Sequence, residues 1–215
     1  MFLVIPLPLL LIAVIAVIVV IGIGSVNEWI ASLDPNFQKN KLKEELLERE
    51  QQYSLEELKR IALDDINKYR EEQGVRTISM GNAKSPQLYA SELLKEGCIH
   101  HVSDNGEGPM LRYQTNHDTM YLISENIAGE VGTSWKKPEQ SVIDANYRMM
   151  YDDASSNWGH KDNILNPDHQ SVSIGIAYDN QRVVMVQDFQ QSLGSGYMYS
   201  SSSFQKEPVD QKFCW

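Results

Sequence analysis

The sequence predicts an α+β domain, with its helices early in the chain and its antiparallel strands late. Apolar residues recur at helical spacing in three segments, and the clearest alternation of apolar and polar residues comes after them. Separate runs of helices and strands are typical of a layered domain. The first charged residue is Glu28, so all 19 basic and 29 acidic side chains belong to the rest of the chain, whose composition fits a soluble domain with a sizeable core.

The N-terminal end is apolar and long enough to cross a membrane. Phe2 to Ile23 is a run of 22 residues without a charge. A helix rises about 1.5 Å per residue, and the hydrocarbon core of a bilayer is about 30 Å thick. The alternative is a cleaved secretory signal, which has a basic start and an apolar core of about 7–15 residues. No lysine or arginine precedes this longer run, so residues 1–26 are predicted to be an uncleaved transmembrane anchor.

A polar segment, residues 27–53, follows the anchor. Asn36 to Tyr53 carries leucines in a narrow i, i+4 stripe, and its acidic and basic residues lie three and four apart, which supports a solvated helix. The segment is therefore predicted to be a helical stalk that holds the domain off the membrane. A self-associating helix is the alternative, but the apolar repeat is too short for a coiled coil.

Three helices are predicted within the domain. The first begins with the capping-box pattern Ser-Leu-Glu-Glu at 54–57 and ends at Gly74. The second opens with Ser85 followed by a proline, which suits the first helical position, and ends at Gly97. The third begins near Pro138, and all three carry apolar residues at helical spacing.

The strands are predicted in the second half of the domain. Val172 to Tyr178 alternates apolar and polar residues, an Asp-Asn turn follows, and Val183 to Phe189 is the returning strand. A shorter strand fits Thr119 to Ser124. Residues 54–191 therefore make up the predicted domain. Residues 192–215 are rich in Ser, Gly and Tyr with mixed charge, and are predicted to be a loose tail.

Charge and cysteine content exclude several functions. A net charge of −10 without a Lys/Arg cluster predicts no nucleic-acid partner, because neutralising phosphates supplies most of that affinity. Two cysteines exclude a disulfide-stapled miniprotein and an all-cysteine zinc site. A location outside the cell would permit a Cys98–Cys214 disulfide that pins the tail to the second helix, although the sequence does not give the Cα separation this bond requires. Cys98 also lies near His101, but close neighbours in a chain rarely present the geometry of a Cys–His nucleophile.

Two histidines and one carboxylate are the candidates for chemistry. His101 opens the segment HVSDNGEGPMLR, Glu125 stands in SENIA directly after a predicted strand, and His160 belongs to WGHKDNILNP before the predicted hairpin. Imidazole and carboxylate ligands at strand and loop ends are the ingredients of an open metal site that leaves positions for water. The three residues are far apart in the sequence, so only the fold could bring them together.

The order of these motifs resembles the CAP superfamily (the cysteine-rich secretory, antigen 5 and pathogenesis-related 1 proteins) in its prokaryotic, SCP-like form, from Leu58 to Phe189. The resemblance implies an α-β-α sandwich with a cleft lined by two histidines and two acidic residues, where some members bind a divalent metal. The elements that carry it are NKYR at 67–70, His101 with Gly106, Pro109 and Arg112, ENIA at 125–128, GHKDNILNP at 159–167, and the strand Ile174-Gly175-Ile176.

Carried over position by position, the resemblance assigns roles to the three candidates. His101 and His160 match the two histidines of the family, and Glu125 matches the acidic residue of its Glu-Asn motif. The resemblance thus implies that these residues hold a divalent metal, zinc or calcium. The same three residues are the candidates for catalysis.

The second acidic residue of the family does not carry over. Its position falls at Met149, and methionine cannot act as a base or as a hard ligand. Asp152 and Asp153, a short way along the chain, are the two alternatives for it. A mechanism that needs all four groups is weakened by this departure, whereas a site of two histidines and one carboxylate is compatible with it.

The remaining histidines are expected to be structural. His100 is a neighbour of the cleft that could lend a third imidazole. His169 stands where relatives have an aromatic residue, which favours packing over ligation. His117 is expected in a loop.

CAP domains are typically secreted or displayed outside the cell, so the resemblance favours a single-pass cell-membrane protein with its domain outside. Lys39, Lys41 and Lys43 favour the opposite orientation, but they lie at the edge of the window in which the positive-inside rule acts. The predicted function is a binding module for a small apolar molecule, a cell-envelope component or a protein ligand. A metal- or histidine-assisted hydrolase and a structural cell-surface protein are the alternatives.

Overall fold

The computed structural model describes residues 35–133, 136–192 and 205–215. The chain divides into two compact units, Met1–Tyr53 and Ser54–Trp215. The predicted transmembrane anchor lies outside the described residues. Within the described ranges, no helix combines the length and apolar character that crossing a membrane requires.

The helix α3 spans Pro35–Glu72 and is the first helix within the described residues. The predicted helix start at Ser54 is therefore wrong, because this serine lies inside the helix. A capping box marks a helix end only where the chain before it leaves the helix, and residues 36–53 consist largely of the strong helix formers Lys, Glu, Gln and Leu. The predicted stalk helix and the first domain helix are one helix.

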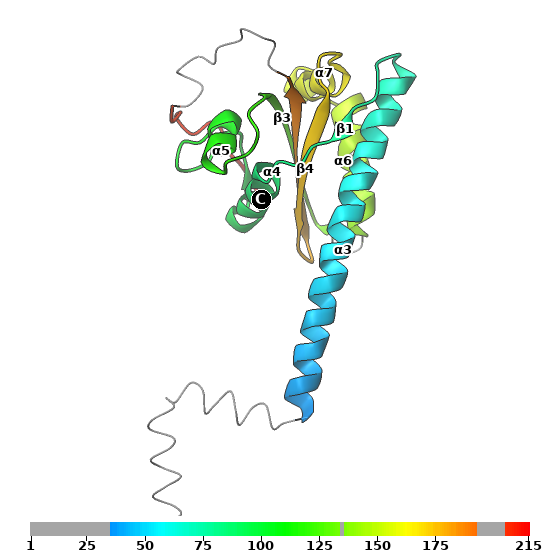
Figure 1. Cartoon of the computed structure of the whole chain (residues 1–215), viewed down its shortest axis with the longest axis vertical. Helices are drawn as coiled ribbons and strands as arrows, with labels where there is room; N and C mark the ends of the chain where they lie inside the picture. Colours follow the sequence, from blue (N-terminus) through cyan, green and yellow to red (C-terminus); the bar gives the residue numbers. More distant parts are fainter. Residues whose placement is uncertain (1–34, 134–135, 193–204) are drawn as a thin grey trace, which may run out of the picture. The chain divides into compact units, whose positions relative to one another are not determined.

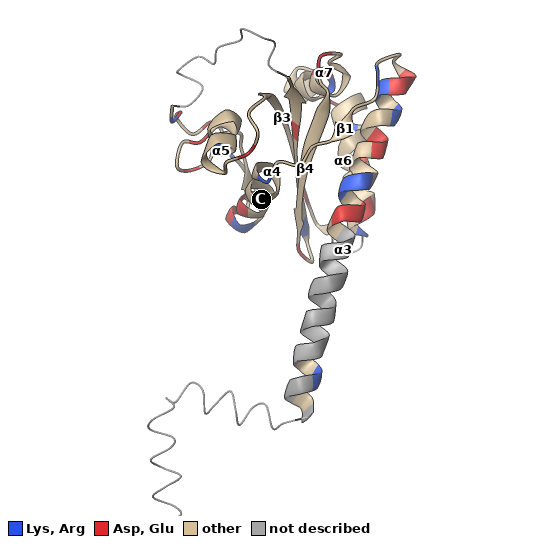
Figure 2. Cartoon of the chain, in the orientation of Figure 1, with Lys and Arg blue, Asp and Glu red and all other residues tan. Residues whose placement is uncertain are grey.

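The part of α3 within the domain is amphipathic. Leu58, Ala62 and Ile66 recur every four residues and are at most 1% exposed. Figure 2 shows charged residues of both signs along this part of the helix. They form the ion pairs Lys59–Glu56, Arg60–Glu57 and Arg60–Asp64.

A mixed sheet of four strands forms the centre of the domain (Figure 1). Its strands are β1 (Ser79–Met80), β3 (Leu122–Val131), β4 (Ser171–Tyr178) and β5 (Arg182–Gln191), in the order β1-β4-β5-β3. β1 pairs with β4 in parallel, and the other pairs are antiparallel. The predicted hairpin is confirmed as β4 and β5.

Helices cover both faces of this sheet, which makes an α-β-α sandwich (Figure 1). α3 packs on one face with α6 (Pro138–Tyr151) and α7 (Gly159–Leu165), and α4 (Ser85–Glu96) packs on the other. Successive side chains of β4 and β5 therefore enter two different cores. The first core includes Leu58, Ala62, Ile66, Val142, Met149, Met150, Ile164, Val172, Ile174, Ile176, Met185 and Phe189, and the second includes Tyr89, Ala90, Leu93, Ile127, Val184 and Val186.

The elements that the sequence missed are short. α5 (Pro109–Thr115) and α7 have 7 residues each, too few for a helical period to stand out. α7 contains the motif GHKDNIL, for which the sequence predicted a place before the hairpin but no helix. The strand predicted at Thr119–Ser124 begins three residues later as β3 and continues to Val131, so the motif ENIA lies inside the strand and not after it.

The last residues of the chain are not a loose tail. β6 (Phe213–Cys214) pairs antiparallel with β2 (Cys98–Ile99), and a disulfide joins Cys98 to Cys214, whose Cα atoms are 4.0 Å apart. The amino-acid composition of this segment favoured disorder, but composition carries no information about a disulfide to a distant part of the chain. The described segment 205–215 is hereafter called the C-terminal strap.

Gly175 is predicted to be essential for the contact between β4 and α4. A Cβ atom at this position would lie 2.0 Å from the carbonyl oxygen of Pro86 and 2.4 Å from the backbone nitrogen of Gln87. Backbone atoms cannot rotate away, so Gly175→Ala should lower the free energy of unfolding by about 3 kcal/mol. Urea unfolding measures this change.

Gly159→Ala is the matched control, because a Cβ there meets nothing within 4 Å. Alanine in the first turn of α7 should leave the stability unchanged or raise it by up to about 1 kcal/mol. Equal effects of the two substitutions would contradict the packing argument.

Candidate functional site

A cleft of about 890 Å³ opens where β2, β3, α7 and the C-terminal strap come together. His101, Glu125 and His160, the three residues predicted from the sequence, all line it. The fold thus brings the candidates together, although they belong to three different elements. The other lining residues are Ile99, His100, Ile127, Ser155, Ser156, Gly159, Asp162, Asn163, Asp210, Gln211 and Phe213.

His101 follows β2 and faces Glu125 on β3. The Nδ1 atom of His101 lies 3.0 Å from Oε1 of Glu125. The side chain of His101 is 47% exposed and that of Glu125 only 2%, so a buried carboxylate stands behind a half-exposed imidazole. The hydrogen bond to Glu125 and the negative charge of this carboxylate raise the pKa of His101.

A buried ion pair holds Glu125 in place. The guanidinium of Arg112, on α5, donates a hydrogen bond to the second oxygen of Glu125. The same guanidinium donates to the carbonyl oxygens of His101 and Glu107, each at 2.8 Å, and stacks 3.6 Å above the ring centre of Tyr89. Burial raises the pKa of Glu125, but Arg112 and His101 together bring it below the usual value, so this carboxyl group is ionised.

His160 lies in the first turn of α7 and has its own carboxylate. Its Nδ1 atom is 2.6 Å from Oδ1 of Asp153, and Oδ2 of Asp153 accepts the backbone N–H groups of His160 and Lys161 at 2.9 and 3.1 Å. Burial raises the pKa of Asp153, but these hydrogen bonds lower it below its usual value. One ionised carboxylate thus caps the helix and orients the imidazole.

Asp153, and not a residue at position 149, is the acidic partner of His160 in the structure. The side chain of Asp153 is 2% exposed and bonds His160, whereas Asp152 is exposed to solvent. Met149 is 4% exposed and belongs to the first core. Of the two alternatives that the sequence left open, Asp153 is the one that contacts a cleft histidine.

Asparagine side chains join the motifs to one another. The amide of Asn126, next to Glu125 in the motif ENIA, donates to the carbonyl oxygen of His160 at 3.1 Å and accepts from Asn163 at 2.8 Å. Arg70 of the motif NKYR is fully buried and donates to the carbonyl oxygen of Ile164, 2.6 Å away. The motifs that carry the family resemblance therefore fix the position of α7 against the sheet.

Both cleft histidines present the same free nitrogen. Each Nδ1 is bonded to a buried ionised carboxylate, so Nδ1 carries the hydrogen and Nε2 of the neutral ring has a lone pair. Within the described residues, neither Nε2 atom has a hydrogen-bond partner. Such nitrogens can bind a transition metal or accept a proton from water. Both oxygens of Glu125 are already engaged, so Glu125 is placed to orient His101.

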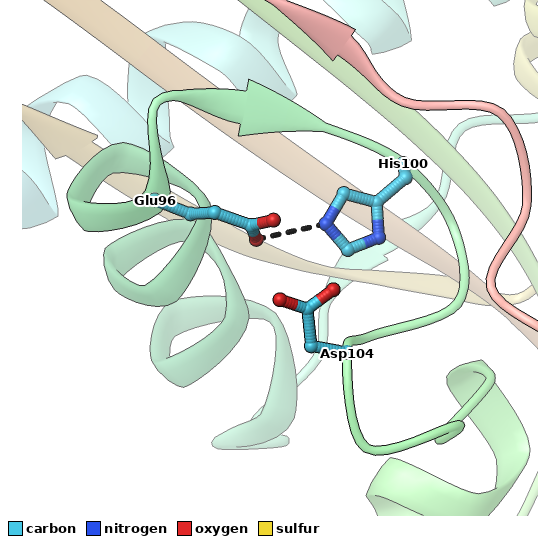
Figure 3. A group of neighbouring side chains, drawn as sticks. All are labelled: Glu96, His100 and Asp104. Atoms are coloured by element: carbon cyan, nitrogen blue, oxygen red, sulfur yellow. Dashed lines mark hydrogen bonds and ion pairs between the residues drawn. The ribbon is translucent and has the colours of Figure 1, made fainter.

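A second group of potential ligands lies beside the cleft (Figure 3). Glu96, His100 and Asp104 each offer a donor atom within 4.8 Å of the others, so the group could hold a metal ion. The ammonium of Lys212 forms ion pairs with both carboxylates, and a metal would have to displace it. This is the one such group among the described residues, so the three predicted ligands do not meet the same distance limit.

The structure also settles the other histidines and the cysteines. Both ring nitrogens of His100 are engaged, Nδ1 by the carbonyl oxygen of Val102 at 2.5 Å, so His100 supplies no third imidazole. His169 stacks on Phe189 with ring centres 5.2 Å apart, which confirms its packing role. His117 lies in the turn after α5, as predicted. The disulfide leaves no free thiol, so a Cys–His nucleophile is excluded.

Asp188, on β5, is a buried acid that sequence reasoning missed. It is 0% exposed and stands opposite Glu125 in the β3–β5 pairing. No donor group in the described part of the chain makes a hydrogen bond to either carboxyl oxygen. Burial, followed by the charge of Glu125, raises the pKa of Asp188 well above its usual value, which favours the neutral form of this acid. An aspartate inside an apolar strand was the available signal.

The sandwich and the paired histidines together define a CAP-type domain. Residues 63–189 match the CAP family, described as the cysteine-rich secretory protein family, and the chain belongs to this family. The resemblance drawn from the order of the motifs is thereby confirmed. No curated protein matches the chain.

Three solved structures of bacterial proteins are similar to this chain. An extracellular SCP-domain protein from Bacillus anthracis strain Ames has 19% identity and a TM-score of 0.43, over 64% of this chain and 40% of that one, so the match spans two fifths of the length of that protein. An outer surface protein of Borrelia burgdorferi has 18% identity and a TM-score of 0.48, over 63% and 94%. The CAP domain of enterococcal PrgA has 14% identity and a TM-score of 0.41, over 65% and 64%.

The ion pair between Arg112 and Glu125 is expected to be critical for stability. Arg112→Leu leaves an ionised carboxylate buried without its cation, which should cost about 3–5 kcal/mol of unfolding free energy. Adding Glu125→Gln removes the unpaired charge and should recover part of this loss. Urea unfolding of the single and double variants tests both steps, and a double variant less stable than Arg112→Leu would refute the explanation.

Asp188→Asn is expected to make the domain less sensitive to pH. The pKa of Asp188 is raised on folding, so the folded protein retains a proton that the unfolded chain releases near pH 4. The natural protein therefore loses stability as the pH rises above that value, and the asparagine variant does not share this loss. Thermal unfolding should show equal stability near pH 4 and a more stable variant near neutrality. The reverse order near neutrality would mean that folding lowers the pKa of Asp188 instead of raising it.

Proposed function

We propose that this chain is an externally displayed CAP-domain binding module whose cleft binds a divalent metal through Nε2 of His101 and Nε2 of His160. The observation that carries the proposal is the pair of imidazoles, each held by a buried ionised carboxylate, with the free nitrogens of both rings in one cleft. Carboxylate partners of this kind fix the tautomer and orientation of metal-binding histidines.

Zinc is the metal that these donors favour. Imidazole nitrogens suit zinc and other transition metals, whereas calcium takes six to eight oxygen ligands. Glu125 uses its oxygens to orient His101 and to pair with Arg112. Two protein ligands leave coordination positions for a ligand group or for water, as an open site requires.

The cleft also has an apolar side that a ligand could use. Ile99, Ile127 and Phe213 line it together with the two histidines. We therefore infer that the module recognises a molecule with an apolar portion next to a metal-binding or polar group. A small molecule, a cell-envelope component and an exposed segment of a protein all fit this description.

The proposed arrangement in the cell is a membrane anchor at 1–26, a stalk over 27–53 and a domain outside. Uncharged residues from Phe2 to Ile23 support the anchor. A disulfide that closes the domain supports an oxidising location, because thiols are kept reduced in the cytosol.

Hydrolysis is the second candidate function. A neutral imidazole with a carboxylate on Nδ1 and a free Nε2 is an effective general base for water. Asp188, the carboxyl group whose pKa is raised, stands opposite Glu125 in the sheet and does not line the cleft, so it is not placed to donate a proton there. For this reason we place binding first.

The test is calorimetric titration of the full chain in a maltoside detergent with Zn²⁺, Ca²⁺ and Mg²⁺. Zn²⁺ is expected to bind at micromolar concentration or below, and His101→Ala/His160→Ala should abolish binding. His117→Asn removes an imidazole from the turn after α5, where φ is 56° and asparagine is well tolerated, and should change nothing.

A second pair of substitutions separates the two possible metal groups. Glu96→Gln/Asp104→Asn removes both carboxylates of the group in Figure 3 and leaves the cleft histidines intact. Zn²⁺ binding that survives this variant and is lost with the cleft histidines supports the proposal. Loss in the opposite pattern, or no binding to the natural chain, would reject the cleft as a metal site.

A further inference from the structure

The C-terminal strap is fastened to the domain at several points. It lies beyond residues 63–189, the part of the chain that matches the family. It is held by backbone hydrogen bonds, a disulfide and ion pairs. In addition, the ring of Trp215 lies over Gly129 of β3, where a Cβ atom would collide with it. The hydrogen bonds, ion pairs and disulfide are Glu207 N–H to Gly106, Asp210 to His101 and Val102, Lys212 to Glu96 and Asp104, Cys214 to Cys98, and Trp215 N–H to Gly97.

The strap also forms a wall of the cleft. Asp210, Gln211 and Phe213 are among the lining residues. Phe213, a large apolar side chain, lines the cleft and is 60% exposed. A ligand in the cleft would therefore contact residues that the family match does not include.

Asp210 holds the backbone from which His101 projects. Its carboxylate accepts the N–H of His101, with Oδ2 at 2.9 Å and Oδ1 at 3.1 Å, and Oδ1 also accepts the N–H of Val102 at 3.0 Å. Hydrogen bonds to an ionised acceptor are about twice as strong as neutral ones. On the other side, Arg112 donates to the carbonyl oxygen of His101. The peptide groups around His101 are thus held from α5 and from the strap together.

We propose that Asp210 is a positioning residue of the cleft, which uses the strap to hold His101 where its Nε2 can meet Nε2 of His160 on a common ligand. The inference rests on the proposed function for its ligand, but the position of His101 can be measured without one. Asp210 acts on the backbone of His101 and is not itself a metal ligand in this proposal. The disulfide keeps Asp210 close to that backbone, because Cys214 is four residues further along the strap.

The test compares Asp210→Ala and Asp210→Asn with the natural full chain in detergent. Zn²⁺ affinity should fall about tenfold in Asp210→Ala, as for other losses of a group that orients a metal-binding histidine. Asp210→Asn retains one side-chain oxygen as acceptor and should lose less. Asp168→Asn removes a carboxylate from an exposed loop and serves as the matched control.

Nuclear magnetic resonance supplies a readout that needs no metal. The amide protons of His101 and Val102 should move upfield in Asp210→Ala, and the Nδ1 proton of His101 should broaden as its bond to Glu125 becomes less ordered. If the natural chain does not bind Zn²⁺, the proposed function fails, while these signals still judge the role of Asp210. Unchanged signals for the His101 ring would overturn the positioning role.

A second experiment removes the disulfide that holds the C-terminal strap to the domain. Cys98→Ser/Cys214→Ser should reproduce the loss of affinity and the changes at His101, since Asp210 is then no longer held in place. Adding Asp210→Ala to this variant should cost nothing further, because the two changes break the same connection. Fully additive losses would show that Asp210 acts independently of the strap and would contradict the proposal.

Discussion

The buried ion pair between Arg112 and Glu125 is the interaction on which the cleft depends. Glu125 stands opposite Asp188 in the sheet, and both side chains are shut off from water. One guanidinium is present for two acids, so the pKa of Glu125 is lowered and the pKa of Asp188 is raised. Because Arg112 also donates to the carbonyl oxygen of His101, the same group secures the carboxylate and the loop that carries the imidazole. Arg112 therefore stabilises the charge of Glu125 and also helps to fix the position of His101.

In each cleft histidine, Nδ1 is bonded to a buried carboxylate, but the two carboxylates are positioned by different parts of the fold. Glu125 is 24 residues from His101 and meets it only because β2 and β3 are neighbours in the fold. Asp153 is 7 residues from His160 and meets it by capping the helix on which His160 lies. An acidic residue on α6 at Met149 is therefore unnecessary for orienting His160. Met149 instead fills the first core, where an ionised side chain would cost several kcal/mol.

Sequence patterns predicted the parts of this fold that extend over many residues. The alternation of apolar and polar residues over Val172–Phe189 was sufficient to predict the hairpin. The order of the motifs was sufficient to predict that His101, Glu125 and His160 line one cleft. Asp188 was missed because its role depends on strand register, and register is a relation between two segments. The choice of Asp153 over Asp152 likewise depends on which side of a tight turn faces α7. Local patterns do not contain that information.

The C-terminal strap adds a wall to the cleft of the α-β-α sandwich. Ordering a terminal segment costs conformational entropy for each residue, and 205–215 contributes little to either core. The disulfide joins residues 116 apart, a closure that restricts the unfolded chain by about 4–5 kcal/mol in the entropic view. Much of the entropy of docking the strap is thereby lost before folding begins. Because the disulfide already holds the strap near the domain, the hydrogen bonds of Asp210 can fix the position of the backbone at His101. A covalent bond at the edge of the domain thus becomes a determinant of geometry inside the cleft.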